Sequence, residues 1–149
     1  MKETVFIGSD HAAYATKVKL VESLKKEFPN LEFDDLGSHD EKSVDYPDFA
    51  AKVGEKVSQG KGKGILLCGS GIGMAISANK INGVRAANVW DVTSARLSKE
   101  HNNSNILCLG ARLTGSEIML VAARARLKAQ VLGDRHQKRV DLISRLERK

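Results

Sequence analysis

The sequence predicts an α/β protein in which a parallel β-sheet carries helices on both faces. Short apolar runs alternate with helical patterns along the chain, and a crossover between parallel strands usually contains a helix. No internal repeat, low-complexity tract or linker interrupts the alternation. The length of 149 residues suits one adequate hydrophobic core, so we expect residues 1–149 to form a single domain.

The predicted strands are apolar runs closed by glycine or polar residues. The third is the clearest, because Ile65-Leu66-Leu67 lies between glycine-containing turns, a pattern typical of a buried parallel strand. The five predicted strands are residues 4–8, 31–36, 64–68, 84–89 and 106–109.

The predicted helices are recognised by apolar spacing and by the residues that begin or end them. Pro47 suits the first turn of a helix. Thr114 and Glu117 have the spacing of a capping box, which predicts a long helix to Leu132 that Gly133 ends. The predicted helices are residues 14–27, 45–58, 74–80, 93–100, 114–132 and 135–147.

Composition excludes several classes of function. The net charge of +6 permits anionic ligands, but no aromatic residue lies in the basic C-terminal region, which argues against stacking on nucleic-acid bases. The chain has no apolar run long enough to span a membrane. Its first residues lack the long apolar region of a signal peptide, so we expect no secretory leader. Cys68 and Cys108 do not make a disulfide framework. We therefore expect a cytoplasmic protein with neither a nucleic-acid nor a membrane partner.

The segment from Cys68 to Met74 is the most informative part of the chain. A thiol at the end of a predicted strand is followed by Gly69, Gly71 and Gly73, which allow a sharp turn with exposed amide N–H groups. The following helix adds partial positive charge, which favours the thiolate form of a nearby cysteine. This arrangement suggests a reactive thiolate beside a site for a developing oxyanion.

Two other interpretations of this segment remain open. It is not a Walker A motif, and Met74 stands at the third glycine position of a dinucleotide fingerprint. Asp91 follows the next predicted strand, however, which keeps a non-catalytic nucleotide-binding module as an alternative. In the other interpretation, Cys68 is an inert core residue.

Polar side chains follow several of the predicted strands. In parallel sheets, ligands bind beyond the carboxyl ends of the strands. Asp10-His11 follows the first strand, Cys68 ends the third and Arg112 follows the fifth, while His101-Asn102 lies just before the fifth. We expect all of these groups at or near one edge of the sheet.

Arg135 and Arg139 lie one helical turn apart, so both face the same side of the last predicted helix. Two guanidinium groups at this spacing can grip a phosphate, although a solvated basic face would look the same. His39 is expected on a surface loop. The histidines and aspartates lack the close spacing of common metal-ligand motifs.

Taken in order, these motifs resemble the ribose-5-phosphate isomerase B family, which also includes galactose-6-phosphate isomerase subunits and allose-6-phosphate isomerases. The resemblance covers nearly the whole chain. The motifs that carry it are Gly8-Ser9-Asp10-His11-Ala12, Asp45-Tyr46-Pro47, Cys68-Gly69-Ser70-Gly71-Ile72-Gly73, Ala78-Asn79-Lys80, Arg85-Ala86, Ser98-x-x-His101-Asn102, Gly110-x-Arg112 and Arg135-His136-Gln137-x-Arg139-Val140.

The resemblance implies a Rossmann-like three-layer α/β/α sandwich with a five-stranded parallel sheet. It also implies a homodimer, in some members a tetramer, whose active sites are each shared between two subunits. The implied reaction interconverts ribose 5-phosphate and ribulose 5-phosphate without a metal or any other cofactor. An isomerase of a six-carbon sugar phosphate is the alternative within the family.

The resemblance also implies a role for each matching residue. Cys68 would move a proton between C2 and C1, and Ser70 and His101 would assist ring opening. The backbone amides around Gly69 to Ala75 would stabilise the enediolate, and they include those of Gly71, Gly73 and Met74. The implied sugar contacts are Asp10, Asp45, Tyr46 and Asn102, and the implied phosphate contacts are His11, Arg112, Arg135, His136 and Arg139, with the terminal arginines coming from the partner subunit.

Two residues depart from the family's frequent pattern. Ser70 stands where many members have threonine, which keeps the hydroxyl but leaves its rotamer less restricted. Ala13 replaces a frequent glycine after Asp-His-Ala. Neither change removes a required functional group.

Overall fold

The computed structural model describes residues 2–147, and these form a five-stranded parallel sheet with the strand order β2-β1-β3-β5-β4. The strands are β1 (Glu3–Ser9), β2 (Leu31–Asp35), β3 (Gly62–Cys68), β4 (Ala86–Asn88) and β5 (Ile106–Gly110). The predicted α/β class and parallel sheet are confirmed.

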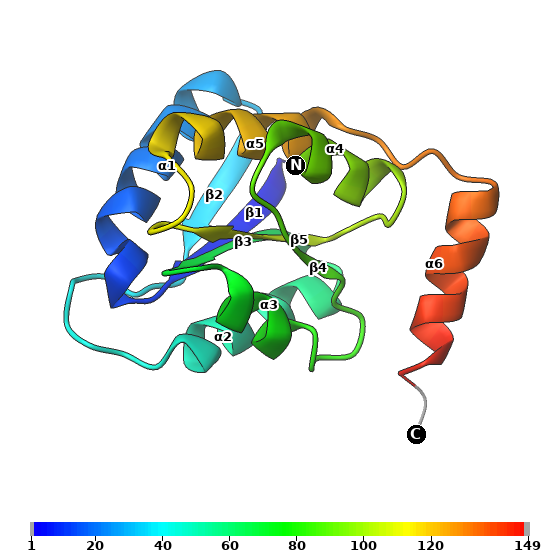
Figure 1. Cartoon of the computed structure of the whole chain (residues 1–149), viewed down its shortest axis with the longest axis horizontal. Coiled ribbons are helices and arrows are strands. Elements are labelled where there is room, and N and C mark those ends of the chain that lie inside the picture. The colour runs from blue at the N-terminus through cyan, green and yellow to red at the C-terminus, as the bar shows by residue number, and fades with distance from the viewer. Residues whose placement is uncertain (1, 148–149) are drawn as a thin grey trace.

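Helices cover both faces of the sheet and complete a three-layer sandwich (Figure 1). One face carries α1, α4 and α5, and the other carries α2 and α3, while α6 lies beside the sandwich at the end of an extended segment. The helices are α1 (Tyr14–Glu27), α2 (Tyr46–Ser58), α3 (Ile72–Ala78), α4 (Val92–Glu100), α5 (Ser116–Lys128) and α6 (Arg135–Arg145), and a short 3₁₀ helix (His11–Ala13) precedes α1.

The core lies in two halves because successive strand residues point to opposite faces of the sheet. Ile7 and Leu67 are buried beneath the α1, α4 and α5 layer, together with Met119 of α5. Leu66 is buried beneath the α2 and α3 layer, together with Val53 of α2. Since both faces are covered, the central strands read as continuous apolar runs in the sequence.

The strand register determines where along the sheet the candidate site lies. Ser9 of β1 pairs with Leu67 of β3, and Cys68 of β3 pairs with Gly110 of β5. The three central strands therefore end level with one another. The polar residues that follow each strand emerge at the same edge of the sheet.

The helix predicted over residues 114–132 differs at both ends. Gly115, not Thr114, is the N-cap residue and supplies no side-chain bond, while the Thr114 hydroxyl is buried without a hydrogen-bond partner among residues 2–147. The capping-box prediction is therefore wrong, because the Thr114 side chain turns into the protein. At the other end α5 stops at Lys128, and the Leu132 amide donates to the Glu100 carbonyl at 3.0 Å. The Leu132 amide therefore bonds the last residue of α4 and does not extend α5.

Smaller shifts affect α3, β4 and α6. The α3 helix begins at Ile72, two residues before the prediction, because Gly71 adopts a left-handed conformation and accepts the first helical bond from Ala75. The observed β4 is shorter than predicted, since the Asn79 side chain bonds both the amide and the carbonyl of Ala86 at its start. The last helix ends at Arg145, two residues early.

A cluster of cations lies at the amino edge of the sheet. Arg126 is 3% exposed and bonds the hydroxyl and carbonyl of Ser104, and burial lowers its pKa to about 10. Burial, together with Arg126, Lys63 and Arg85, lowers the pKa of Lys99 to about 8. Since Arg126 and Arg85 bond backbone carbonyls there, this cluster supports the fold at the edge opposite the polar strand ends.

No helix among residues 2–147 is both long enough and apolar enough to cross a membrane.

Gly62 is a position where the fold leaves no room for a side chain. A Cβ atom there would overlap the Thr4 carbonyl oxygen of the adjacent strand, which is backbone and cannot rotate away. We expect Gly62→Ala to lower the free energy of unfolding by about 1–3 kcal/mol, measured by urea denaturation. Gly115→Ala is the matched control, because its Cβ would enter open space, and its effect should stay within about 0.5 kcal/mol. Equal effects of the two changes would contradict this packing argument.

Candidate active site

A cleft of about 540 Å³ opens at the carboxyl edge of the sheet. Its walls come from the ends of β1, β3 and β5, the start of α2 and the first turns of α3. Among the predicted site residues, the cleft brings together seven. The lining consists of Asp10, Tyr46, Cys68, Gly69, Ser70, Ile72, Gly73, Ile76, Arg112 and Leu113.

The Cys68 sulfur is held by the glycine-rich loop that follows it. The Gly71 amide donates to Cys68 Sγ at 3.1 Å, and the Ile72 amide donates to Ser70 Oγ at 3.1 Å. Because the first amides of a helix have no intrahelical acceptor, the Gly73 and Met74 N–H groups remain available at the start of α3. Met74 has a buried side chain, so only its backbone can take part.

The Ala75 amide differs from the other predicted amide donors. It donates to the Gly71 carbonyl at 3.1 Å, forming the first bond of α3. It is therefore already occupied.

Two glycines permit side chains to close over the loop. A Cβ on Gly73 would come within 2.5 Å of the Tyr46 ring, so the ring lies directly against that backbone. A Cβ on Gly69 would lie 3.5 Å from Arg112 Nη1, which places the guanidinium beside the turn that follows Cys68. The loop thus has an aromatic ring on one side and a fixed positive charge on the other.

The back of the loop packs against β5 and β4. A Cβ on Gly110 would overlap the Ser70 backbone, and one on Gly71 would lie 2.6 Å from Asn88 Oδ1. The amides of Ala111 and Arg112 donate to the Cys68 and Gly69 carbonyls, each at 2.9 Å. These contacts fix the loop from behind and leave its front facing the cleft.

Asp10 and His11 are positioned by backbone bonds. Asp10 caps the short helix after β1, with Oδ1 accepting from the Ala13 amide at 3.1 Å. The Val44 amide donates to His11 Nδ1 at 3.1 Å, so a neutral His11 carries its proton on Nε2 and acts as a donor there. Asp45 is the N-cap residue of α2 and is exposed, but it does not line the cleft.

The remaining predicted residues form a second group, which we call the α4–α6 group: His101, Asn102, Arg135, His136 and Arg139. None of them lines the cleft. The expectation that all polar groups meet at one edge of a single chain is therefore wrong for His101 and Asn102. The reason is that α4 ends at Glu100, at the opposite edge, where Asn102 lines a separate hollow beside Arg85 and Ile143.

The α4–α6 group is organised by a stacked pair of imidazoles. The rings of His101 and His136 lie 4.3 Å apart and are parallel within 3°. His136 Nε2 is buried with no hydrogen-bond partner among residues 2–147. Burial lowers the pKa of His136, and the neighbouring His101, Arg135 and Arg139 lower it further. His136 thus lies in an environment that disfavours its charged form.

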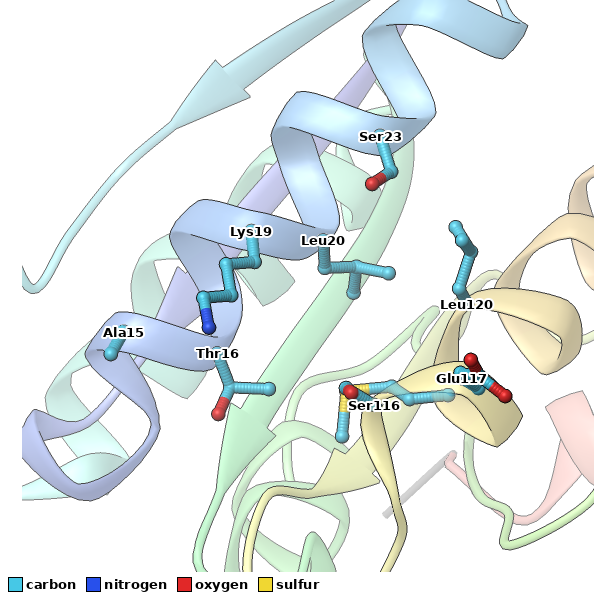
Figure 2. Close-up of a pocket in the computed structure, with 9 residues that line it drawn as sticks. Ala15, Thr16, Lys19, Leu20, Ser23, Ser116, Glu117 and Leu120 are labelled. Atoms are coloured by element: carbon cyan, nitrogen blue, oxygen red, sulfur yellow. The ribbon is translucent and has the colours of Figure 1, made fainter.

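A further hollow, of about 450 Å³, lies between α1 and α5 (Figure 2). Thr16, Lys19 and Ser23 face it from α1, and Ser116 and Glu117 face it from α5. It contains none of the predicted site residues and no cysteine or histidine. The cleft beside Cys68, by contrast, is lined by seven of the predicted site residues.

Sequence reasoning missed the apolar part of the cleft. Ile72, Ile76 and Leu113 line it, and Ile76 and Leu113 are each about 60% exposed. Large apolar residues at exposed positions are a signal for an interface or a binding surface, but exposure is not visible in a sequence.

The second cysteine is buried in the core. Desolvation raises the pKa of the Cys108 thiol, and the nearby Cys68 adds to the effect. Within residues 2–147, no three His, Cys, Asp or Glu side chains come together as a metal site.

Comparison with known proteins identifies the family. The family model for Ribose/Galactose Isomerase matches residues 5–143. Ribose-5-phosphate isomerase B of Escherichia coli is 38% identical over 150 residues, covering 100% of this chain and 99% of that protein.

Solved structures agree with this match. The Mycoplasma genitalium ribose-5-phosphate isomerase B, solved with bound ribulose-5-phosphate, has a TM-score of 0.94 at 39% identity, covering 100% of this chain and 99% of that chain. The Clostridium thermocellum enzyme has a TM-score of 0.93 at 44% identity, covering 97% of each chain. With matching motifs, a matching fold and a family model that covers most of its length, the chain belongs to the ribose/galactose isomerase family.

Proposed function

We propose that this protein interconverts ribose 5-phosphate and ribulose 5-phosphate, with Cys68 as the base that moves the proton. The observation that carries the proposal is the Cys68 sulfur at the floor of the cleft, 3.1 Å from the Gly71 amide and flanked by Tyr46 and Arg112. The relative from Mycoplasma genitalium, whose structure holds ribulose-5-phosphate, supports the choice of substrate.

The reaction needs a base that reaches two adjacent carbons. Cys68, as thiolate, would take the proton from C2 of the open-chain aldose and return it to C1 of the enediolate, while the hydroxyl proton on O2 passes to O1. A single base suffices because C1 and C2 are adjacent, and the proton leaves C2 and returns to C1 on the same face of the enediolate. The Ser70 hydroxyl and His101 would act before this step, in opening the sugar ring, and Asp10 would contact the sugar.

The enediolate places negative charge on oxygen, so the site also needs donors aimed at that oxygen. The glycine-rich loop offers backbone N–H groups, including those of Gly73 and Met74 at the start of α3. Backbone donors held from behind by Gly110 and Asn88 do not reorganise during the reaction. This prearrangement is what makes such donors effective in catalysis.

Phosphate would be held at the other end of the substrate. His11 offers an Nε2 donor and Arg112 a guanidinium, and Arg135, His136 and Arg139 supply further donors on α6. Because the α4–α6 group does not line the cleft of its own chain, we propose that a second copy of the chain supplies it. The complete site would then be shared within a homodimer.

Exposed apolar residues support this arrangement. Leu142 of α6 and Leu146, the residue that caps its C-terminus, follow Arg139 at helical spacing and are 46% and 74% exposed. Ile76 and Leu113 are exposed at the cleft. Packing one surface against the other would bury apolar side chains and carry the arginines to the phosphate end. The proposed function as a whole is tested by mixing the protein with ribose 5-phosphate and following ketose formation.

The role of Cys68 has a matched control within the chain. We expect Cys68→Ala to abolish isomerisation while sugar phosphate still binds, because the thiol serves the reacting carbons and the phosphate is held elsewhere. Cys108→Ala should cost about 1–2 kcal/mol of stability but leave turnover largely unchanged, since this thiol is buried in the core. The measurements are kcat, and ligand binding by calorimetry. Turnover by Cys68→Ala at a near wild-type rate would show that another group is the base.

Arg139 is expected to act on binding. Arg139→Ala should raise KM for ribose 5-phosphate by about 10- to 100-fold, the range for loss of a charge-assisted hydrogen bond. Arg145→Ala is the control, because Arg145 is an exposed arginine on the same helix and outside the proposed site. The measurement is KM from the steady-state kinetics of both variants. Equal KM values for the two variants would contradict a role of Arg139 in phosphate binding.

The stacked histidines predict a pH dependence. Because its pKa is lowered, we expect His136 to titrate below 6.5 in an NMR experiment. Arg139→Ala should move the midpoint up, and Asp134→Asn should move it down, since Asp134 favours the charged ring. A base with a lowered pKa binds fewer protons folded than unfolded, so stability should fall as the pH drops below 6.5. A midpoint above 6.5 in the wild type would contradict the proposed environment.

A further inference from the structure

Lys17, in the first turns of α1, is fully buried, with 0% of its side chain exposed. Its ammonium group lies 2.8 Å from Asp35 Oδ1 and also donates to the Ser38 carbonyl. A buried charge is tolerated only when such partners compensate for lost hydration. The position of Lys17 is therefore tied to the conformation of the chain just after β2.

Those bonds fix the start of the loop that joins β2 to α2, residues 36–45. Asp35 Oδ1 also accepts from the Gly37 amide at 2.9 Å. Gly37 and Ser38 in turn pair with the backbone of Ser9 at the end of β1, at 2.7 and 2.8 Å. Lys17 thus bonds the two residues, Asp35 and Ser38, that bracket this turn.

The other end of the same loop carries groups of the proposed active site. The Val44 amide donates to His11 Nδ1, Asp45 occupies the N-cap position of α2 without a side-chain bond, and Tyr46 lines the cleft against Gly73. The loop between these ends is exposed over residues 39–43. Its path is set by the fixed turn at 35–38 and by the bond to His11.

We infer that Lys17 is a positioning residue for substrate binding. It holds the 36–45 loop in the conformation that presents Tyr46 to the cleft and orients His11 through Val44. Lys17 does not line the cleft and has no exposed surface with which to touch substrate. This inference rests on the proposed function, because it assigns the loop a role in binding the sugar phosphate.

The test compares two buried cations, Lys17 and Arg126. Lys17 bonds the loop after β2, and Arg126 lies at the amino edge of the sheet. Lys17→Met removes the charge but keeps the volume, and the Asp35 carboxylate it leaves behind is 35% exposed and can be hydrated. Arg126→Met removes a buried arginine at the amino edge, away from the loop. Both variants should lose thermal stability, so stability alone does not separate the two roles.

Kinetics and amide hydrogen exchange do separate them. We expect Lys17→Met to raise KM for ribose 5-phosphate about tenfold with kcat changed less than about threefold, because the Cys68 loop is untouched. Exchange at the Ser38 and Val44 amides should be faster by about tenfold. Arg126→Met should leave KM and both amides within about twofold of the wild type.

The inference is overturned if Lys17→Met leaves both KM and loop exchange at wild-type values, or if Arg126→Met changes them equally. Asp35→Asn gives the same comparison, with a smaller expected shift, should Lys17→Met fail to fold. A wild-type protein without ribose 5-phosphate turnover would defeat the proposed function instead. The hydrogen-exchange comparison would then still decide whether Lys17 holds the loop.

Discussion

The close approach of β5 to the loop after β3 is the constraint on which the rest of the site depends. Gly110 has no side chain, so the backbone of Ser70 lies directly against it, and any Cβ there would displace the loop. The register that pairs Cys68 with Gly110 makes this contact possible. From it follow the bond from Gly71 to the sulfur, the path of the first turn of α3, and the position of Arg112 beside Gly69. One backbone contact thus sets the geometry of thiol, amides and guanidinium together.

The site separates two physical tasks. The reacting end of the cleft consists mainly of backbone amides, a thiol and an aromatic ring, all held by glycine contacts. The phosphate-type donors belong to the segments that follow β1 and β5, as with His11 and Arg112, and to α6, a helix beside the sandwich (Figure 1). In the proposed reaction, binding energy from the charged phosphate, remote from the chemistry, would hold the sugar while the glycine-rich loop acts on the carbons.

Local patterns predicted the parts of this structure that are themselves local. The strand before Cys68, the turn through three glycines and the helix after it are encoded in consecutive residues, and their bounds moved by only two residues: the strand begins at Gly62, and the helix runs from Ile72 to Ala78. The capping box failed because Thr114 turns into the core, a choice made by packing and not by spacing. The expectation for His101 and Asn102 failed for a different reason: residues that precede a strand of a parallel sheet lie at its amino edge, and both of these residues precede β5. The burial of Lys17 was not predicted, because a lysine in an amphipathic helix is normally expected to be exposed. Only the fold shows that Asp35 and Ser38 are its partners.

The loop between β2 and α2 is anchored at both ends and exposed in the middle, over residues 39–43. The free energy of closing such a loop changes by only about 0.6 kcal/mol when its length doubles. Insertions or deletions there would leave the sheet, Lys17 and the core packing intact. Evolution could therefore alter the rim next to Tyr46 at almost no cost in folding stability. In this fold, the capacity to vary is concentrated in five residues beside a glycine-rich loop that itself has almost no room to change.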